Sequence, residues 1–152
     1  MNLQSLLQNN QIEPVNTNAV DARAQLNKAY KQYHFAKKNL SGVGDEDIVY
    51  NHIYDSLRLA CTAILYLNGH RVKTSGPGHH WITVQAASLM INELPNEFKR
   101  IEKMRKKRNI LEYGNSLPIS ETELKQGMND AHTLLERVDK LIGEKEPKLP
   151  II

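Results

Sequence analysis

The sequence is poor in cysteine and has no long hydrophobic run. Its single cysteine, Cys61, excludes an internal disulfide and predicts a reducing, cytoplasmic location. No stretch approaches the roughly 18 apolar residues that a membrane-spanning helix needs, so no membrane association is expected. The opening residues MNLQSLLQNNQ also lack the basic and apolar regions of a secretory signal.

The motifs of several well-known enzyme and metal sites are also absent. There is no CxxC or HExxH pattern, and the adjacent His79 and His80 have no visible third ligand, so no metal site is predicted. There is no GxxxxGK[ST], GxGxxG or GxSxG pattern. A phosphate loop, a dinucleotide-binding turn and a hydrolase nucleophile elbow therefore have no support, and no cofactor is expected.

What is present is a helical pattern. Apolar residues recur at steps of three and four, and no segment shows sustained alternation with a period of two. We therefore predict an all-α fold, an up-and-down bundle of about five helices joined by short connections. The main helices are expected at about residues 18–40, 45–68, 81–93, 96–113 and 120–142.

The domain organisation follows from the same pattern. Residues 1–14 are expected to form a short N-terminal helix or arm, residues 15–145 the bundle, and residues 146–152 a tail. The segment from His70 to His80 contains Gly76, Pro77 and Gly78 and is predicted to be a loop.

The basic residues are concentrated in one segment. The formal net charge is only +3, but residues 99–108 (KRIEKMRKKR) hold seven basic residues and one acidic residue. The rest of the chain holds 13 basic and 16 acidic residues, so the whole positive surplus comes from this segment. Such a run is typical of a solvated helix face, and its helical geometry decides whether it is more than that.

Helical geometry divides these basic residues into two groups. With about 100° per residue, Arg105 and Arg108 lie within about 40° of Ile101, on the face that Phe98 and Met104 identify as core. Lys99, Lys103, Lys106 and Lys107 lie well outside that face and are expected in solvent. A buried guanidinium without a partner is costly. We therefore expect either an internal Arg108–Glu112 ion pair or a cleft that binds anions, because the arginine fork suits phosphate.

This helix resembles the signature helix of HEPN domains (higher eukaryotes and prokaryotes nucleotide-binding). In that signature an arginine precedes a polar residue, often Asn, and a histidine follows four to six residues after the arginine. The matching segment is Arg105–Tyr113, with an RxxRNxxxY pattern. Upstream, Tyr54–Ala60, Gly69–Arg71 and Gly78–His80 resemble the helix–loop–helix part of the family. The resemblance spans about residues 15–145.

The resemblance implies a bundle of four or five helices. It also implies, usually, a homodimer in which two signature helices form one positively charged cleft. Many members are metal-independent ribonucleases, often toxins of toxin–antitoxin or phage-defence systems, that use the 2′-hydroxyl of RNA as internal nucleophile. Arg108 matches the family's arginine and Asn109 the polar residue beside it. The family's histidine has no counterpart, because position 112 is Glu and position 113 is Tyr.

Cleavage through the 2′-hydroxyl needs a proton acceptor, a proton donor and stabilisation of charge at the phosphate. The arginines can supply the last. Three alternatives remain for the groups that assist proton transfer: Glu112 as a base, Tyr113 as a hydrogen-bond donor, or His79 or His80 reaching the cleft across the bundle. The catalytic candidates are Arg108, Asn109, Glu112 and Tyr113. The candidates for binding phosphate or RNA are Arg105, Lys106 and Arg108.

Three functions are consistent with these residues. The first is a ribonuclease toxin or effector in which Arg108 binds the scissile phosphate. The second is a non-catalytic module that binds RNA or a nucleotide in the same cleft. The third is a structural partner of a minimal nucleotidyltransferase of the antitoxin kind, in which the arginines serve only folding or assembly.

Overall fold

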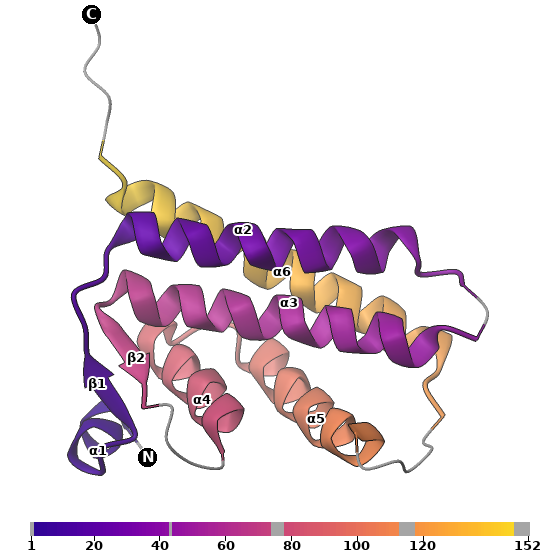
Figure 1. The fold of residues 1–152 in the computed structure, drawn as a ribbon, viewed down its shortest axis with the longest axis horizontal. Helices are drawn as coiled ribbons and strands as arrows, with labels where there is room; N and C mark the ends of the chain where they lie inside the picture. The colour runs from indigo at the N-terminus through magenta and orange to yellow at the C-terminus, as the bar shows by residue number, and fades with distance from the viewer. Residues whose placement is uncertain (1, 43, 74–77, 113–117, 148–152) are drawn as a thin grey trace, which may run out of the picture.

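The computed structural model describes residues 2–42, 44–73, 78–112 and 118–147, and only the backbone of Glu112. These residues form a helical bundle with one small sheet (Figure 1). The elements are α1 (Leu3–Gln8), β1 (Ile12–Pro14), α2 (Ala19–Lys38), α3 (Glu46–Leu67), β2 (His70–Val72), α4 (His79–Ile91), α5 (Pro95–Glu112) and α6 (Glu121–Lys145). The predicted all-α class and the five long helices are confirmed. No helix in these ranges is long and apolar enough to cross a membrane.

Helix α3 is the centre of the bundle. It contacts α2, α4, α5 and α6, and α4 and α5 lie on the side of α3 opposite α2 (Figure 1). Half of its residues are buried, which agrees with the wide apolar stripe of its sequence. The fully covered side chains include those of Leu57, Cys61 and Ile64. A helix covered from several sides can place polar residues deep in the protein, and α3 does so at its middle.

Local signals fix the helix starts. Asn18 caps α2 in a capping box with Asp21, and Ser120 caps α6 in a capping box with Glu123. The ends are less well predicted. Helix α6 continues through Gly143 to Lys145, because one exposed glycine lowers helix stability without ending the helix.

The predicted loop at residues 70–80 is partly wrong. His70–Val72 forms β2, which pairs antiparallel with β1 in the register Ile12 to Val72. The Nε of Arg71 lies 2.7 Å from Oε1 of Glu13 across the pair. Strands of three residues are too short to show alternation, so periodicity cannot detect them. The pair holds the N-terminal arm against the bundle, where Leu6 of α1 is fully buried.

Helix α4 begins two residues before the predicted start. His79 and His80 belong to its first turn and are not part of a loop. Gly78 is the N-cap with a φ of 88°, a left-handed conformation that favours glycine. The segment 74–77 lies outside the described residues. The earlier start matters because it turns both histidines toward the neighbouring helices.

Candidate functional site

The inward face of α5 changes from apolar to polar along its length. Ile101 and Met104 are buried, and the side chains that follow on the same face, Arg105 and Arg108, are only 18 % and 17 % exposed. Both arginines therefore lie on the inward face, as helical geometry predicts. Asn109, the next residue, is exposed. Tyr113 and the side chain of Glu112 lie outside the described residues, and so does the expected Arg108–Glu112 pair.

Lys107 was expected in solvent, and that expectation is wrong. Its side chain is 19 % exposed, and its Nζ lies 2.7 Å from Oε2 of Glu123 and 2.8 Å from the Pro118 carbonyl oxygen. The same Nζ lies 5.8 Å from the centre of the Tyr50 ring. The start of α6 covers this side of α5, and the sequence pattern of α5 alone contains no information about that neighbour.

Arg105 is held by its own helix. Its Nη2 lies 2.6 Å from Oε1 of Glu102, and its Nε donates to both carboxylate oxygens at 3.0 and 3.1 Å. These hydrogen bonds are the main reason why the pKa of Arg105 is raised. The spacing of three residues fixes the guanidinium along α5 and directs it toward α4.

Arg108 reaches α3 instead. Its Nη2 lies 3.8 Å from Oδ1 of Asp55, and its guanidinium carbon lies 5.2 Å from the centre of the Tyr54 ring. The same Asp55 oxygen lies 3.7 Å from Nε of Arg58. One carboxylate of α3 therefore lies within ion-pair distance of two guanidinium groups, and the ring of Tyr54 supports one of them by a cation–π contact.

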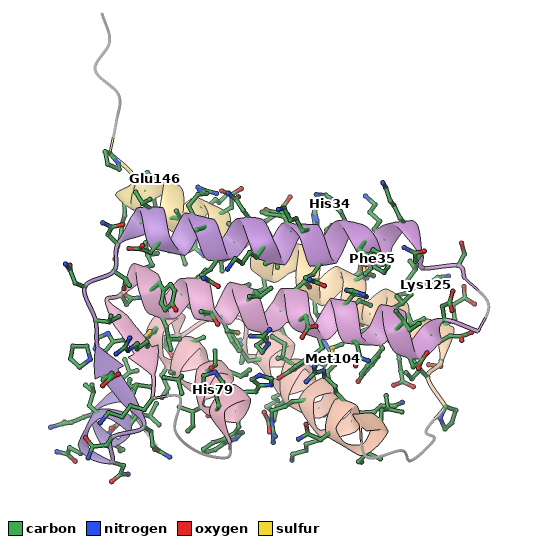
Figure 2. All side chains as sticks on the ribbon, in the orientation of Figure 1. His34, Phe35, His79, Met104, Lys125 and Glu146 are labelled. Atoms are coloured by element: carbon green, nitrogen blue, oxygen red, sulfur yellow. The ribbon has the colours of Figure 1, made fainter. Side chains whose placement is uncertain are left out.

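The two histidines of α4 join this arrangement. The ring of His80 lies 6.2 Å from that of Tyr54 and 5.6 Å from that of His79. Burial, followed by the charges of Arg58 and Arg108, lowers the pKa of His80 to about 4. His80 is therefore a neutral imidazole at neutral pH and can accept a proton. Figure 2 shows His79 on the α4 side of α3, far from His34 on the outer face of α2.

A small pocket lies between the start of α4 and the second half of α5. It has a volume of about 230 Å³. Its lining residues are Gly78, His79, His80, Trp81, Arg105 and Asn109. The structure thus brings the two histidines to the predicted arginine site, where the sequence left their position open. The lining offers both charge for an anion and a group for proton transfer.

Buried polar atoms near this pocket have spare hydrogen-bonding capacity. Oη of the fully buried Tyr54, Nε of Arg58 and Nδ1 of His79 have no hydrogen-bond partner among the described residues. Most buried polar groups in proteins are hydrogen-bonded, and those that are not often belong to functional sites. These three atoms come from α3 and α4, so the polar cluster is built by two helices facing α5.

A family model of the HEPN domain matches residues 22–141. The chain belongs to the HEPN domain family. The match runs from α2 to α6 and includes every residue of the polar cluster around Tyr54, His80 and Arg108. No curated protein and no solved structure matches the chain significantly.

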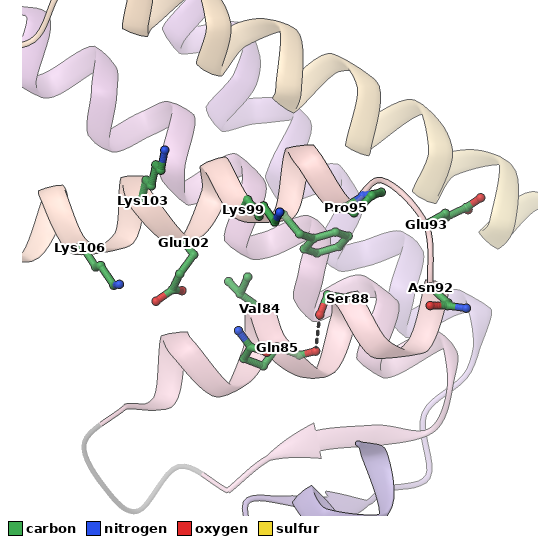
Figure 3. Close-up of a pocket in the computed structure, with 11 residues that line it drawn as sticks. Val84, Gln85, Ser88, Asn92, Glu93, Pro95, Lys99, Glu102, Lys103 and Lys106 are labelled. Atoms are coloured by element: carbon green, nitrogen blue, oxygen red, sulfur yellow. Dashed lines mark hydrogen bonds between the residues drawn. The ribbon is translucent and has the colours of Figure 1, made fainter. Parts of the chain in front are cut away.

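The HEPN bundle has a second hollow beside the pocket. It has a volume of about 630 Å³ and lies between α4 and the first half of α5 (Figure 3). Val84 and Phe98 contribute apolar surface, and the exposed side chains of Lys99, Lys103 and Lys106 line its α5 side. We call this hollow the lysine groove. Glu102 lines the groove and binds Arg105, which lines the pocket, so the two hollows adjoin.

Three residues of the candidate site were not predicted from the sequence. Tyr54, Asp55 and Arg58 lie in a segment that resembles the family, but they received no role there. The sequence signal that could have identified two of them is the charged pair Asp55 and Arg58, three residues apart on a helix that is otherwise largely apolar. In the described part of the chain, no group of three His, Cys, Asp or Glu side chains is placed to hold a metal ion.

Proposed function

We propose that this HEPN domain is an endoribonuclease that binds RNA at the pocket between α4 and α5. The observation that carries the proposal is the small pocket that Arg105 shares with His79 and His80, with Arg108 beside the Tyr54 ring that His80 also faces. Guanidinium groups suit the phosphate oxygens, and a neutral imidazole suits proton transfer. The site then resembles the family's arginine–histidine pairing, with histidines from a different helix.

The reaction proposed is internal transesterification. The 2′-oxygen of a ribose attacks the adjacent phosphorus, the bond from phosphorus to the 5′-oxygen breaks, and the products are a 2′,3′-cyclic phosphate and a 5′-hydroxyl. Arg105 and Arg108 stabilise the charge that grows on the non-bridging phosphate oxygens. The family resemblance indicates that this chemistry proceeds without a metal ion, in a toxin or effector of a toxin–antitoxin or defence system.

A homodimer is part of the proposal. The exposed end of α5 carries Asn109 and Ile110, and Ile110 is a large apolar side chain that is 42 % exposed. A second copy packed there would cover Ile110 and bring two signature helices together, as the family resemblance implies. Light scattering of the purified protein tests this, and a monomer over the micromolar range would contradict it.

The deciding experiment compares RNA with DNA. The purified protein is incubated with an RNA oligonucleotide, with DNA of the same sequence, and with RNA that carries one 2′-deoxy position. We expect cleavage of RNA to cyclic-phosphate ends, unchanged by EDTA, no cleavage of DNA, and protection at the 2′-deoxy position. Intact RNA that is bound would favour the non-catalytic binding module. Intact RNA without binding would favour a structural partner of a nucleotidyltransferase.

The lysine groove leads to a second prediction, which concerns the path of the RNA strand. If the RNA strand continues from the pocket along α5, replacing Lys99, Lys103 and Lys106 with alanine weakens binding and makes it less sensitive to salt. Three lost phosphate contacts lower the slope of log K against log salt concentration by about 2 for a single strand. Fluorescence anisotropy with labelled RNA at several salt concentrations measures the slope.

The matched control for the groove removes the same charge elsewhere. Lys28, Lys31 and Lys37 are exposed on α2, on the other side of α3. Their triple alanine variant is expected to keep a slope close to that of the wild type. Equal slopes for the two triple variants would show that the groove is not the path of the RNA and that only net charge matters.

A further inference from the structure

We propose that His80 of α4 is the catalytic proton acceptor of this site and takes the proton from the attacking 2′-hydroxyl. This inference rests on the proposed ribonuclease function and adds to it the residue that performs proton transfer. It moves that role from the end of α5, where the sequence suggested Glu112 and Tyr113, to the first turn of α4. The groups near the pocket from α3, α4 and α5 differ in how well they can accept a proton.

The carboxylates near the pocket that the structure describes lie beside arginines. Both oxygens of Glu102 accept hydrogen bonds from Arg105 at 2.6 to 3.1 Å. Asp55 lies 3.7 Å from Arg58 and 3.8 Å from Arg108. In this geometry both carboxylates serve to position guanidinium groups.

Tyr54 and His79 are also less suited than His80. The Tyr54 hydroxyl is buried, and burial raises its pKa to about 12, so it stays protonated at neutral pH. The Nδ1 of His79 is buried, so this nitrogen is less accessible to a substrate hydroxyl. Of the two histidine rings, His80 is the one that lies against Tyr54, which in turn supports Arg108.

His80 therefore lies next to the phosphate-binding arginines and has the required protonation state. The charged or titratable groups facing it are Tyr54, Asp55 and Arg58 from α3, His79 from α4, and Arg105 and Arg108 from α5. Burial first, and then the charges of Arg58 and Arg108, lower the pKa of His80 and keep the imidazole neutral in the free protein. A bound phosphate anion offsets those charges and makes the imidazole a stronger base in the complex than in the free protein.

The step balances without a further reactant. His80 takes the proton as the 2′-oxygen forms its bond to phosphorus. The bond from phosphorus to the 5′-oxygen breaks, and the leaving 5′-oxygen takes a proton from water. His80 then returns its proton to solvent, and the protein is unchanged.

The test replaces His80 with asparagine and, separately, with alanine. We expect His80→Asn to lower kcat/KM for RNA at least a hundredfold, which is the range of general-base catalysis. The dissociation constant for uncleavable 2′-deoxy RNA should change less than threefold. Added imidazole should restore part of the activity of His80→Ala. The matched control is His34→Asn on the outer face of α2, which should leave activity unchanged.

The pH profile gives a second readout. The wild-type kcat/KM reports the free protein and should fall as pH drops toward 4, because protonated His80 cannot accept a proton. A third readout needs no activity. In an NMR titration, binding of the 2′-deoxy RNA should raise the pKa of the His80 ring.

The outcomes separate this inference from the proposed function. If the wild type cleaves RNA and His80→Asn cleaves it equally well, the role of His80 is wrong and the ribonuclease function stands. If the His80→Asn variant loses both RNA binding and RNA cleavage, or if imidazole does not restore activity to His80→Ala, His80 is a positioning residue and its catalytic role is wrong. If the wild type leaves RNA intact and the His80 ring does not respond to 2′-deoxy RNA, both proposals fail.

Discussion

Replacing Arg108 with alanine is expected to lower the rate of RNA cleavage at least about a hundredfold and to abolish any growth arrest caused by expression. Arg108 matches the family's arginine in the sequence resemblance, it lies on the inward face of α5, and its guanidinium lies near Asp55 and the ring of Tyr54. Removing one such group that stabilises transition-state charge costs about 2.7–4 kcal/mol. Single-turnover cleavage of a labelled RNA measures the rate.

Two further measurements make this result specific. Arg108→Lys keeps the charge but loses the planar fork, so we expect an intermediate rate between those of the wild type and Arg108→Ala. Asp55 keeps Arg58 at 3.7 Å when Arg108 is removed, so the variant is expected to stay folded, which urea denaturation checks. Wild-type cleavage by a folded Arg108→Ala variant would contradict the assigned role.

The sequence predicts the helices well because their signals are local. The starts of α2 and α6 follow from Asn18 and Ser120, whose side chains bind the backbone of their own first turns. The inward direction of Arg105 and Arg108 is equally local, because it depends only on the rotation per residue along α5. The same geometry could also have predicted the ion pair of Arg105 with Glu102, because the two residues are three positions apart on one helix.

The composition of the site is less predictable because it depends on which helices meet. Periodicity shows that α3 has a wide buried face, but not that Asp55 on it would meet Arg108 of α5. It also cannot show that the first turn of α4 would place His80 beside Tyr54. These contacts join residues more than 20 positions apart, so they follow from tertiary packing and not from any local pattern.

Tyr54→Ala is expected to lower the free energy of unfolding by about 3–5 kcal/mol, the range for truncating a large buried aromatic side chain. Tyr54 is fully buried at the centre of α3, and its ring contacts both Arg108 and His80. Losing the ring leaves a cavity and removes the surface that positions both groups. RNA cleavage should therefore fall even at temperatures where the variant remains folded.

The matched variants separate packing from positioning. Tyr54→Phe keeps the ring, and it removes a buried hydroxyl that has no hydrogen-bond partner among the described residues. Its unfolding free energy should be unchanged or higher by about 1 kcal/mol, because an unsatisfied buried polar group is costly, and cleavage should stay within threefold of the wild type. Leu134→Ala in α6 also creates a cavity, since Leu134 is fully buried, but outside the site.

The comparison of these variants decides whether Tyr54 is a positioning residue. Chemical denaturation gives the stabilities, and cleavage is measured at low temperature, where all three variants are folded. If Tyr54→Ala and Leu134→Ala lose similar stability and equal activity, the ring acts only as core. If Tyr54→Ala alone loses activity while Tyr54→Phe retains it, the ring is the element that holds Arg108 of α5 and His80 of α4 against one another. A site assembled from three helices needs such a shared support. Neither α4 nor α5 alone fixes the distance between the guanidinium of Arg108 and the imidazole of His80.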